Sequence, residues 1–276
     1  MKKDDRKQIN AAKKRKSKGW SRYFPSVARP DLGVLGNSQT IGAEPFCVFP
    51  FISLQRKGKK KYYKCEGTGF FIHHTGLFVT AKHVPIYDEQ VLKSFIAIHA
   101  HGIYVSVRHV KIFWINKNSD IAVGFLDEKD ARNKMVYQRG MDYNHLIPNY
   151  SESQVGQVVK NFGYGGSKIE DYNKNYNYAE FNKQWHEGPI IGIYPEGRGS
   201  WNKTGPEIEG VYGTIGLASG GPVFNETGEL IGVNSKSMPK SIDGSPPISV
   251  FTPISEILEI KIEHPIDGEI KIKDLK

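Results

Sequence analysis

The chain has 276 residues, and its 38% hydrophobic and 12% aromatic content can fill a sizeable core. Its formal net charge is +9, but residues 1–18 hold nine basic and two acidic side chains and account for +7 of that charge. The rest of the chain is almost neutral, which argues against a specific nucleic-acid-binding surface on the folded body. There is no run of 18 apolar residues, so we expect no membrane span.

The N-terminal 33 residues consist of this basic segment and an aromatic, proline-containing lead-in. We expect a flexible, solvated tail, and its KKRK run at 13–16 could contact an anionic partner. No apolar stretch follows Met1, so we expect no signal peptide and a cytoplasmic location. Cys47 and Cys65 fit that location as reduced, half-buried thiols.

The body of the chain is a succession of short β-rich segments separated by Gly, Asn and Asp residues. Many short strands between turn residues, without a helical period, are typical of an all-β protein of barrels or sandwiches. We expect eleven strand segments, at 47–54, 61–73, 77–84, 94–100, 103–115, 120–127, 157–165, 189–197, 209–217, 229–235 and 247–253.

The last expected strand is followed by a helix-start pattern. Thr252 is suited to the N-cap position and Pro253 to the first helical position, and apolar residues follow. The pattern predicts a short C-terminal helix.

The segment around Ser219 carries the first sign of chemistry. Gly220 and Gly221 follow this serine, and glycines permit a tight turn that a substrate backbone can approach. A plain hairpin loop is the alternative, because a serine hydroxyl needs a base and an orienting acid to become a nucleophile. His83, at the end of an expected strand, is the candidate base, and Asp120, which opens an apolar strand, is the candidate acid.

Five segments around these residues resemble, in order, the motifs of trypsin-like (chymotrypsin-fold) serine proteases. The likeness is greatest to bacterial, HtrA-like peptidase domains, and it extends over roughly residues 38–262. The five segments are GTGFF at 67–71, TAKH at 80–83, SDIAV at 119–123, SGGPV at 219–223 and GELIGVN at 228–234.

The resemblance implies two packed, antiparallel, six-stranded β-barrels with the active site between them. Ser219 would attack a peptide carbonyl, His83 would transfer the proton, and Asp120 would hold the imidazole. We therefore expect four parts: a tail and lead-in at 1–33, a first barrel at 34–140, a second barrel at 141–252, and a C-terminal helix and tail at 253–276. We expect no PDZ domain.

The oxyanion hole is expected from the backbone N–H groups of Leu217, Ala218 and Ser219. The family usually has glycine at the position of Leu217, where a bulky residue can be strained. The hole could therefore be unformed at rest, or the turn could be built differently. Ala218 replaces the acid that binds a newly cut N-terminus in digestive members, so we do not expect activation by that route.

The substrate pocket is expected around Gly213, Thr214 and the strand residues Asn234, Ser235 and Lys236. Trypsin-type enzymes place an acid at the position of Gly213, so a preference for lysine or arginine by that device is not expected. The three strand residues would pair with a substrate backbone. Lys236 would either favour an acidic side chain or point to solvent.

Metal chemistry is the first alternative, because the chain has nine histidines. There is no HExxH and no CxxC spacing, and the neighbours His73 and His74 would face opposite sides of a strand. We expect no metal and no cofactor.

The second alternative is a catalytically silent protease-fold scaffold that binds a peptide by strand pairing. The presence of all three triad residues favours instead a serine endopeptidase acting on a protein or peptide substrate. Leu217 and the long, polar loop at 164–188 suggest narrow or partner-controlled specificity.

Overall fold

The structure is a computed structural model of the chain. The residues that it describes are 20–23, 32–33, 47–57, 60–87, 90–91, 95–101, 104–130, 143–173, 176–197, 205–214, 216–238, 246–264 and 267–275. Residues 1–19, and with them the basic run and its expected anionic partner, lie outside the described residues.

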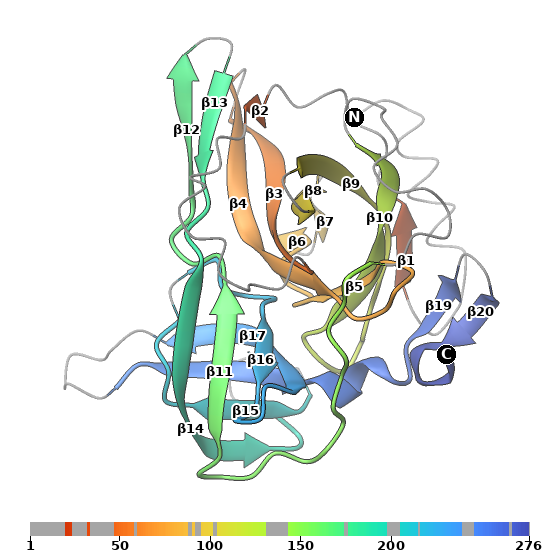
Figure 1. The fold of residues 1–276 in the computed structure, drawn as a ribbon, viewed down its shortest axis with the longest axis vertical. Coiled ribbons are helices and arrows are strands. Elements are labelled where there is room, and N and C mark those ends of the chain that lie inside the picture. Colours follow the sequence, from red (N-terminus) through yellow and green to blue (C-terminus); the bar gives the residue numbers. More distant parts are fainter. Residues whose placement is uncertain are drawn as a thin grey trace.

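The first barrel is a six-stranded antiparallel sheet in the order β9-β10-β5-β4-β3-β8, closed by the pairing of β8 with β9 (Figure 1). A seventh strand, β1, pairs with β9 outside this ring. The bounds are β1 (Trp20–Tyr23), β3 (Val48–Lys57), β4 (Lys60–Phe71), β5 (Leu77–Thr80), β8 (Phe95–His101), β9 (Tyr104–Ile115) and β10 (Ala122–Asp130). A small hairpin of β6 (Ile86–Tyr87) and β7 (Gln90–Val91) follows β5.

The second barrel is a closed antiparallel sheet in the order β11-β14-β15-β18-β17-β16. Its strands are β11 (Val158–Gly163), β14 (Gln184–Tyr194), β15 (Glu207–Gly210), β16 (Pro222–Phe224), β17 (Leu230–Met238) and β18 (Ile248–Pro253). The predicted fold class, two packed six-stranded β-barrels, is confirmed.

Each of the eleven expected segments overlaps one barrel strand, but of the segment expected at 209–217 only Glu209 and Gly210 belong to β15. The twelfth barrel strand, β16, has three residues and overlaps the SGGPV segment around Ser219. A strand this short has too few residues for an alternating or apolar pattern in the sequence. β14 begins at Gln184, earlier than expected, and its burial alternates residue by residue in the manner of a half-exposed strand.

The polar segment at 164–188, expected as a loop, contains the hairpin β12 (Lys168–Asn173) and β13 (Tyr176–Glu180). The short strand β2 (Leu32–Gly33) pairs with β13 in parallel, and the hairpin rises beside β4 of the first barrel (Figure 1). Two apolar residues near its base, Ile169 and Phe181, pack against a first-barrel cluster. The second barrel's hairpin is therefore held by the first barrel.

The expected C-terminal helix is a single 3₁₀ turn, η1 (Ile254–Ile257). The N-cap role of Thr252 is wrong, because strand β18 continues through Thr252 to Pro253 and no side chain caps the turn. The hairpin β19 (Lys261–His264) and β20 (Gly268–Lys271) follows, and then the 3₁₀ turn η2 (Ile272–Asp274). No helix in the described residues is long and apolar enough to cross a membrane.

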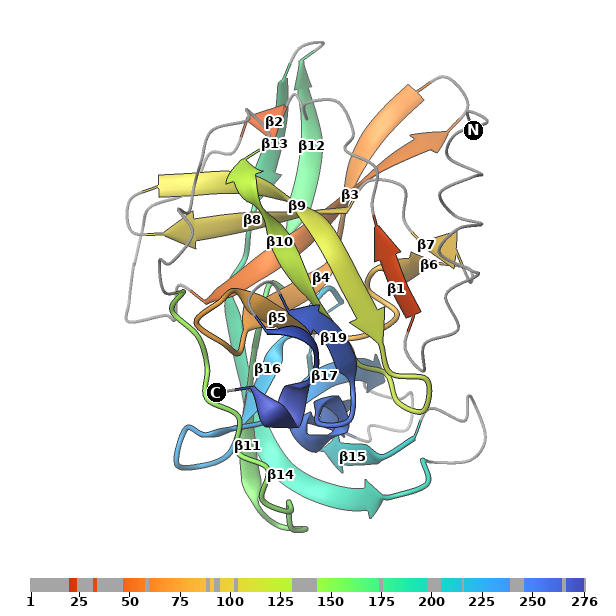
Figure 2. The ribbon, with the colours of Figure 1, turned by 90° about the vertical axis from the view of Figure 1, so that its right-hand side faces the viewer.

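One hydrophobic core continues from the first barrel to the inner side of the second. It contains Phe162, Leu230 and Val233 of the second barrel, and Ile257 and Ile262 of the C-terminal segment. The C-terminal hairpin lies at the junction of the barrels (Figure 2). Packing of this kind fixes the two barrels against each other, which positions any site formed between them.

The two cysteines are free and buried, rather than half-buried as expected. Burial raises the pKa of both the Cys47 and the Cys65 thiols to about 12, so neither is a reactive thiolate at neutral pH.

Candidate active site

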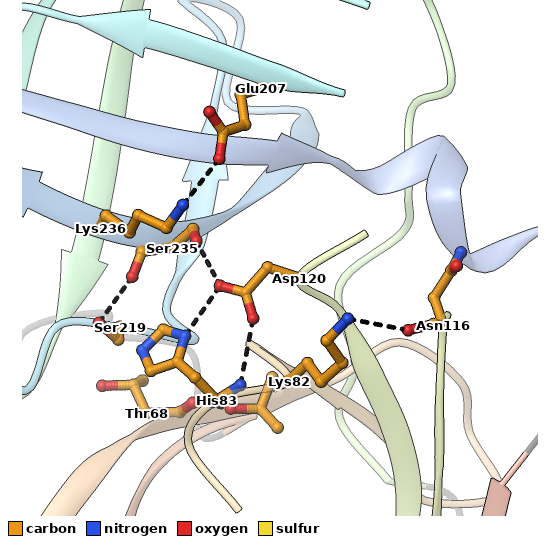
Figure 3. Close-up of polar contacts among 10 residues, drawn as sticks. Thr68, Lys82, His83, Asn116, Asp120, Glu207, Ser219, Ser235 and Lys236 are labelled. Carbon is orange, nitrogen blue, oxygen red and sulfur yellow. Dashed lines mark hydrogen bonds and ion pairs between the residues drawn. The ribbon is translucent and has the colours of Figure 1, made fainter. Parts of the chain in front are cut away.

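His83 and Asp120 are brought together by the pairing of β5 with β10. Ala122 lies opposite Thr80 in this register, so the residues just outside the two strands also meet. Nδ1 of His83 is 2.8 Å from Oδ2 of Asp120, and the backbone N–H of His83 donates to Oδ1 at 3.1 Å (Figure 3). The candidate base and acid thus lie in direct contact at the edge of the first barrel.

Asp120 is buried, with 5% of its surface exposed, and accepts a third hydrogen bond from Oγ of Ser235 in the second barrel. Burial opposes ionisation of this carboxyl, but the His83 charge and the hydrogen bonds from His83 and Ser235 outweigh burial and lower the pKa of Asp120 below its ordinary value. An ionised Asp120 accepts a hydrogen bond from the Nδ1–H of His83, so Nε2 is left with the lone pair that a general base needs.

The pKa of His83 is shifted in the opposite direction. Burial lowers it, the charge and hydrogen bond of Asp120 raise it by more, and the positive charge of Lys236 partly opposes the rise. The net result is a pKa above the ordinary value of 6.5. A base of this strength accepts a proton readily near neutral pH.

Ser219 comes from the second barrel and lies beside the imidazole edge that faces away from Asp120 (Figure 3). Its hydroxyl donates to the backbone carbonyl of Ser235 at 2.8 Å, and the described contacts include no hydrogen bond from it to His83. The structure therefore brings all three predicted residues to one place, with the hydroxyl turned toward strand β17.

The turn before Ser219 has an unusual backbone. Leu217 has φ of +83°, and it is the only non-glycine residue with positive φ in the described part of the chain. The Leu217 carbonyl accepts from Oγ1 of Thr68 at 3.2 Å, and the Gly216 carbonyl accepts from the backbone N–H of Gly166 at 3.0 Å. Leu217 thus adopts the left-handed conformation that glycine reaches without steric cost.

Ser235 has a role that the sequence reasoning missed. A bulge in the β17–β18 pairing leaves Ser235 between Asn234, opposite Phe251, and Lys236, opposite Val250. A bulged residue is released from the ladder and can be redirected. Its side chain contacts Asp120 and its carbonyl accepts from Ser219. Nothing in the sequence marks this bulge, because it arises from pairing between distant strands.

The other expected binding residues have different surroundings. The Asn234 N–H donates to the Gly221 carbonyl at 2.8 Å, and its own carbonyl accepts from the Gly220 N–H at 2.7 Å. The Asn234 backbone therefore holds the nucleophile turn. Lys236 forms an ion pair at 2.8 Å with the buried Glu207, and 40% of the Lys236 side chain is exposed. Its preference for an acidic substrate side chain stays a prediction.

Gly213 and Thr214 lie against the start of β18. A side chain at Gly213 would meet Cγ of Pro247 at 2.7 Å. Oγ of Ser249 lies 2.9 Å from the Thr214 hydroxyl and accepts from its N–H at 3.2 Å. No acidic side chain stands at either position.

His73 and His74 do not face opposite sides, because they lie in the turn after β4 and their ring centroids are 4.2 Å apart. The His73 ring is 5.9 Å from that of His264, which contacts Thr75 and Asp267. Within the described residues, no group of three or more His, Cys, Asp or Glu side chains has a geometry that could hold a metal ion.

Solved structures with this fold include several proteases. The HtrA-type protease AlgW with a decapeptide is 14% identical with a TM-score of 0.54, and the match covers 76% of this chain and 62% of AlgW. The active form of the Rv3671c protease from M. tuberculosis is 17% identical with a TM-score of 0.52, covering 84% and 89%. The MamO protease domain from Magnetospirillum magneticum, in its apo form, is 15% identical with a TM-score of 0.50, covering 76% and 92%. At these identities the likeness shows the fold.

No curated protein sequence matches the chain. The family profile described as trypsin-like peptidase domain matches residues 67–233, which is more than half of the sequence and includes all three candidate catalytic residues. The chain therefore belongs to the trypsin-like peptidase domain family.

Proposed function

We propose that the protein is a serine endopeptidase in which Ser219 is the nucleophile, His83 the general base and Asp120 the orienting acid. The observation that carries this proposal is the buried Asp120, which accepts three hydrogen bonds and holds His83 beside Ser219. A scaffold that only binds peptides does not need this arrangement. The decapeptide in the AlgW structure supports a peptide substrate for the related site of this chain.

The reaction begins when the Ser219 hydroxyl leaves the Ser235 carbonyl and turns to Nε2 of His83. His83 takes the proton as Ser219 attacks the peptide carbonyl, and Asp120 stabilises the resulting imidazolium. The negative charge on the carbonyl oxygen is stabilised by backbone N–H groups at Leu217 to Ser219. The protonated His83 then gives its proton to the leaving amine, and water releases the acyl group by the same steps.

The competing function, a silent scaffold, is favoured by one observation: the Ser219 hydroxyl is bonded to Ser235 at rest. A serine-directed phosphonate separates the two functions, because only an activated serine reacts with it. Labelling of the wild-type protein at Ser219, absent in Ser219→Ala, supports the endopeptidase. An unlabelled wild type that still binds peptides supports the scaffold.

We further propose narrow, partner-controlled specificity and an intracellular location, the latter in keeping with two free thiols. The N–H of Gly166, near the base of the β12–β13 hairpin, bonds to the Gly216 carbonyl of the oxyanion turn. Asn182, at the other base of this hairpin, donates to the Gly166 carbonyl at 3.2 Å. A protein that binds the hairpin can therefore change the conformation of the oxyanion turn through these two hydrogen bonds.

This path predicts that casein is cleaved slowly by the purified protein and that a specific protein partner or substrate raises the rate. Leu217→Gly should raise casein hydrolysis by about fivefold, because glycine removes roughly 1 kcal/mol of left-handed strain at the turn. Leu217→Ala is the matched control and should give no such gain, since it keeps the Cβ that causes the strain. Rapid casein digestion by the wild type, or equal rates for the glycine and alanine variants, would contradict the prediction.

The raised pKa of His83 predicts the acid side of the pH profile. His83 must be neutral to act as base, so kcat/KM should fall as the pH decreases through a midpoint above 6.5. Lys236→Met should move this midpoint to higher pH, because the Lys236 charge lowers the pKa of His83. Lys261→Met, in the C-terminal hairpin, is the control and should leave it in place. A midpoint below 6.5 in the wild type would remove Asp120 as the partner that raises the His83 pKa.

A further inference from the structure

Thr68, in strand β4 of the first barrel, is fully buried at the contact between the two barrels. Its backbone N–H donates to the carbonyl of Ser219 at 2.8 Å. Its own carbonyl accepts from the hydroxyl of Thr80 at 2.7 Å, on strand β5. The backbone of Thr68 thus joins the nucleophile of the second barrel to the strand that leads to His83.

The Thr68 hydroxyl makes two further contacts in the second barrel. It accepts a hydrogen bond from the backbone N–H of Tyr164 at 3.2 Å. It donates to the carbonyl of Leu217 at 3.2 Å. A threonine hydroxyl has one proton, and the Tyr164 N–H can only donate, so this proton is committed to Leu217.

This bond and the bond from Gly166 hold both peptide groups that flank Leu217. A peptide group is planar, so fixing its carbonyl also fixes the direction of the following N–H. The Gly216 carbonyl, held by Gly166, sets the direction of the Leu217 N–H. The Leu217 carbonyl, held by Thr68, sets the plane that leads to Ala218. In the described residues, no backbone carbonyl accepts from the N–H of Leu217, Ala218 or Ser219, the three groups expected to face the oxyanion.

The conformation that these bonds hold is unfavourable for leucine by itself. A left-handed φ places the Cβ of a non-glycine residue against its own backbone, so Leu217 at +83° needs external restraint. Thr68 supplies that restraint from strand β4 of the first barrel, whereas Gly166 lies in a turn. The Thr68 hydroxyl therefore restrains the Leu217 carbonyl, and with it the oxyanion turn, from a strand of the first barrel.

We propose that Thr68 is a positioning residue for catalysis: its buried hydroxyl, donated across the barrel junction to the Leu217 carbonyl, holds the oxyanion turn in its left-handed conformation. The proposal rests on the proposed serine endopeptidase function and adds a residue that does not touch the substrate. It assigns to the first barrel a part in forming an oxyanion hole that the second barrel's backbone provides.

The first test compares Thr68→Val, which has nearly the same shape without the hydroxyl, with Thr68→Ser, which keeps the hydroxyl. Thr68→Val should lower kcat for a peptide substrate by about ten- to a hundredfold, because a buried carbonyl and N–H lose their partner. KM should change less than threefold, and Thr68→Ser should restore kcat to within about threefold of wild type. Equal kcat for wild type and Thr68→Val would overturn the proposal, as would an equal loss in the serine variant.

The second test separates positioning from a general loss of stability by a double-mutant cycle with Leu217→Gly. Glycine adopts the left-handed conformation without strain, so the turn needs less restraint. The kcat penalty of Thr68→Val should therefore be at least about threefold smaller in the Leu217→Gly protein than in the wild type. An unchanged penalty would mean that Thr68 acts elsewhere, and would overturn the proposal.

A peptide boronic acid, which forms a tetrahedral adduct on an activated serine, distinguishes failure of this proposal from failure of the proposed function. Thr68→Val should weaken boronate binding by about tenfold or more, while binding of the parent peptide to Ser219→Ala should be the same with and without Thr68→Val. A wild type that neither binds the boronate nor hydrolyses peptides refutes the endopeptidase itself. A wild type that binds the boronate no better than Thr68→Val refutes only the role of Thr68.

Discussion

Ser219→Ala, His83→Ala and Asp120→Ala are each expected to lower kcat for peptide hydrolysis by about 10⁴-fold or more while the protein stays folded. Ser219→Ala removes the attacking oxygen. His83→Ala removes the group that accepts its proton. Asp120→Ala removes the acceptor that holds Nδ1 of His83 at 2.8 Å, and with it the reason for the raised His83 pKa.

The measurement is the steady-state hydrolysis of a substrate peptide by each variant, with circular dichroism and thermal unfolding as tests of folding. Ser151→Ala, at an exposed serine in the segment between β10 and β11, is the control and should retain wild-type activity. Because the three residues act as one unit, Ser219→Ala with His83→Ala should be little worse than either alone. Near wild-type turnover in any single variant would exclude that residue from the triad.

Eleven of the barrel strands could be predicted because the sequence pattern of each lies within the strand itself. Alternating or continuous apolar runs between Gly, Asn and Asp residues define a strand without reference to its partner. Strand β16 was missed because its three residues have no such pattern and are strand only by pairing with β11 and β17. The helix-start pattern at Thr252 and Pro253 was misleading because both residues pair with strand β17 and so belong to strand β18.

The candidate triad residues could be identified from the sequence because each lies in a short motif with a recognisable neighbour pattern. The residues that surround them could not. Thr68, Ser235 and Glu207 acquire their roles from contacts across the barrel junction or across the second barrel. Such contacts depend on register and on bulges, and one bulge between Asn234 and Lys236 decides where the Ser235 side chain points.

The candidate active site is therefore formed only where the two barrels pack against each other. Asp120 of the first barrel is bonded to Ser235 of the second, and Thr68 of the first is bonded to Ser219 and Leu217 of the second. Neither barrel alone contains a complete set of these groups. A substitution that separates the barrels by even a small distance should therefore remove activity and stability together.

Gly220→Ala is expected to have this effect. Gly220 follows the nucleophile with φ of +85°, and a Cβ placed there would lie 2.1 Å from the Thr68 carbonyl oxygen and 2.2 Å from the Thr80 hydroxyl. Both contacts are far shorter than any nonbonded approach. One of the neighbours is backbone in a barrel strand, so the strain cannot be relieved by turning a side chain.

Gly228→Ala is the matched control, because Gly228 has φ of +82° and a Cβ there would meet nothing within 4 Å. Both variants incur the left-handed cost of roughly 1 kcal/mol, but only Gly220→Ala adds the steric clash at the junction. We expect Gly220→Ala to lower the free energy of unfolding by at least about 3 kcal/mol more than Gly228→Ala, or to prevent folding, and to abolish hydrolysis. Urea unfolding of the two proteins gives the difference directly. If the two variants have equal unfolding free energies, the two barrels do not meet at Gly220 as described. The contacts of Thr68 across the barrel junction would then be wrong as well.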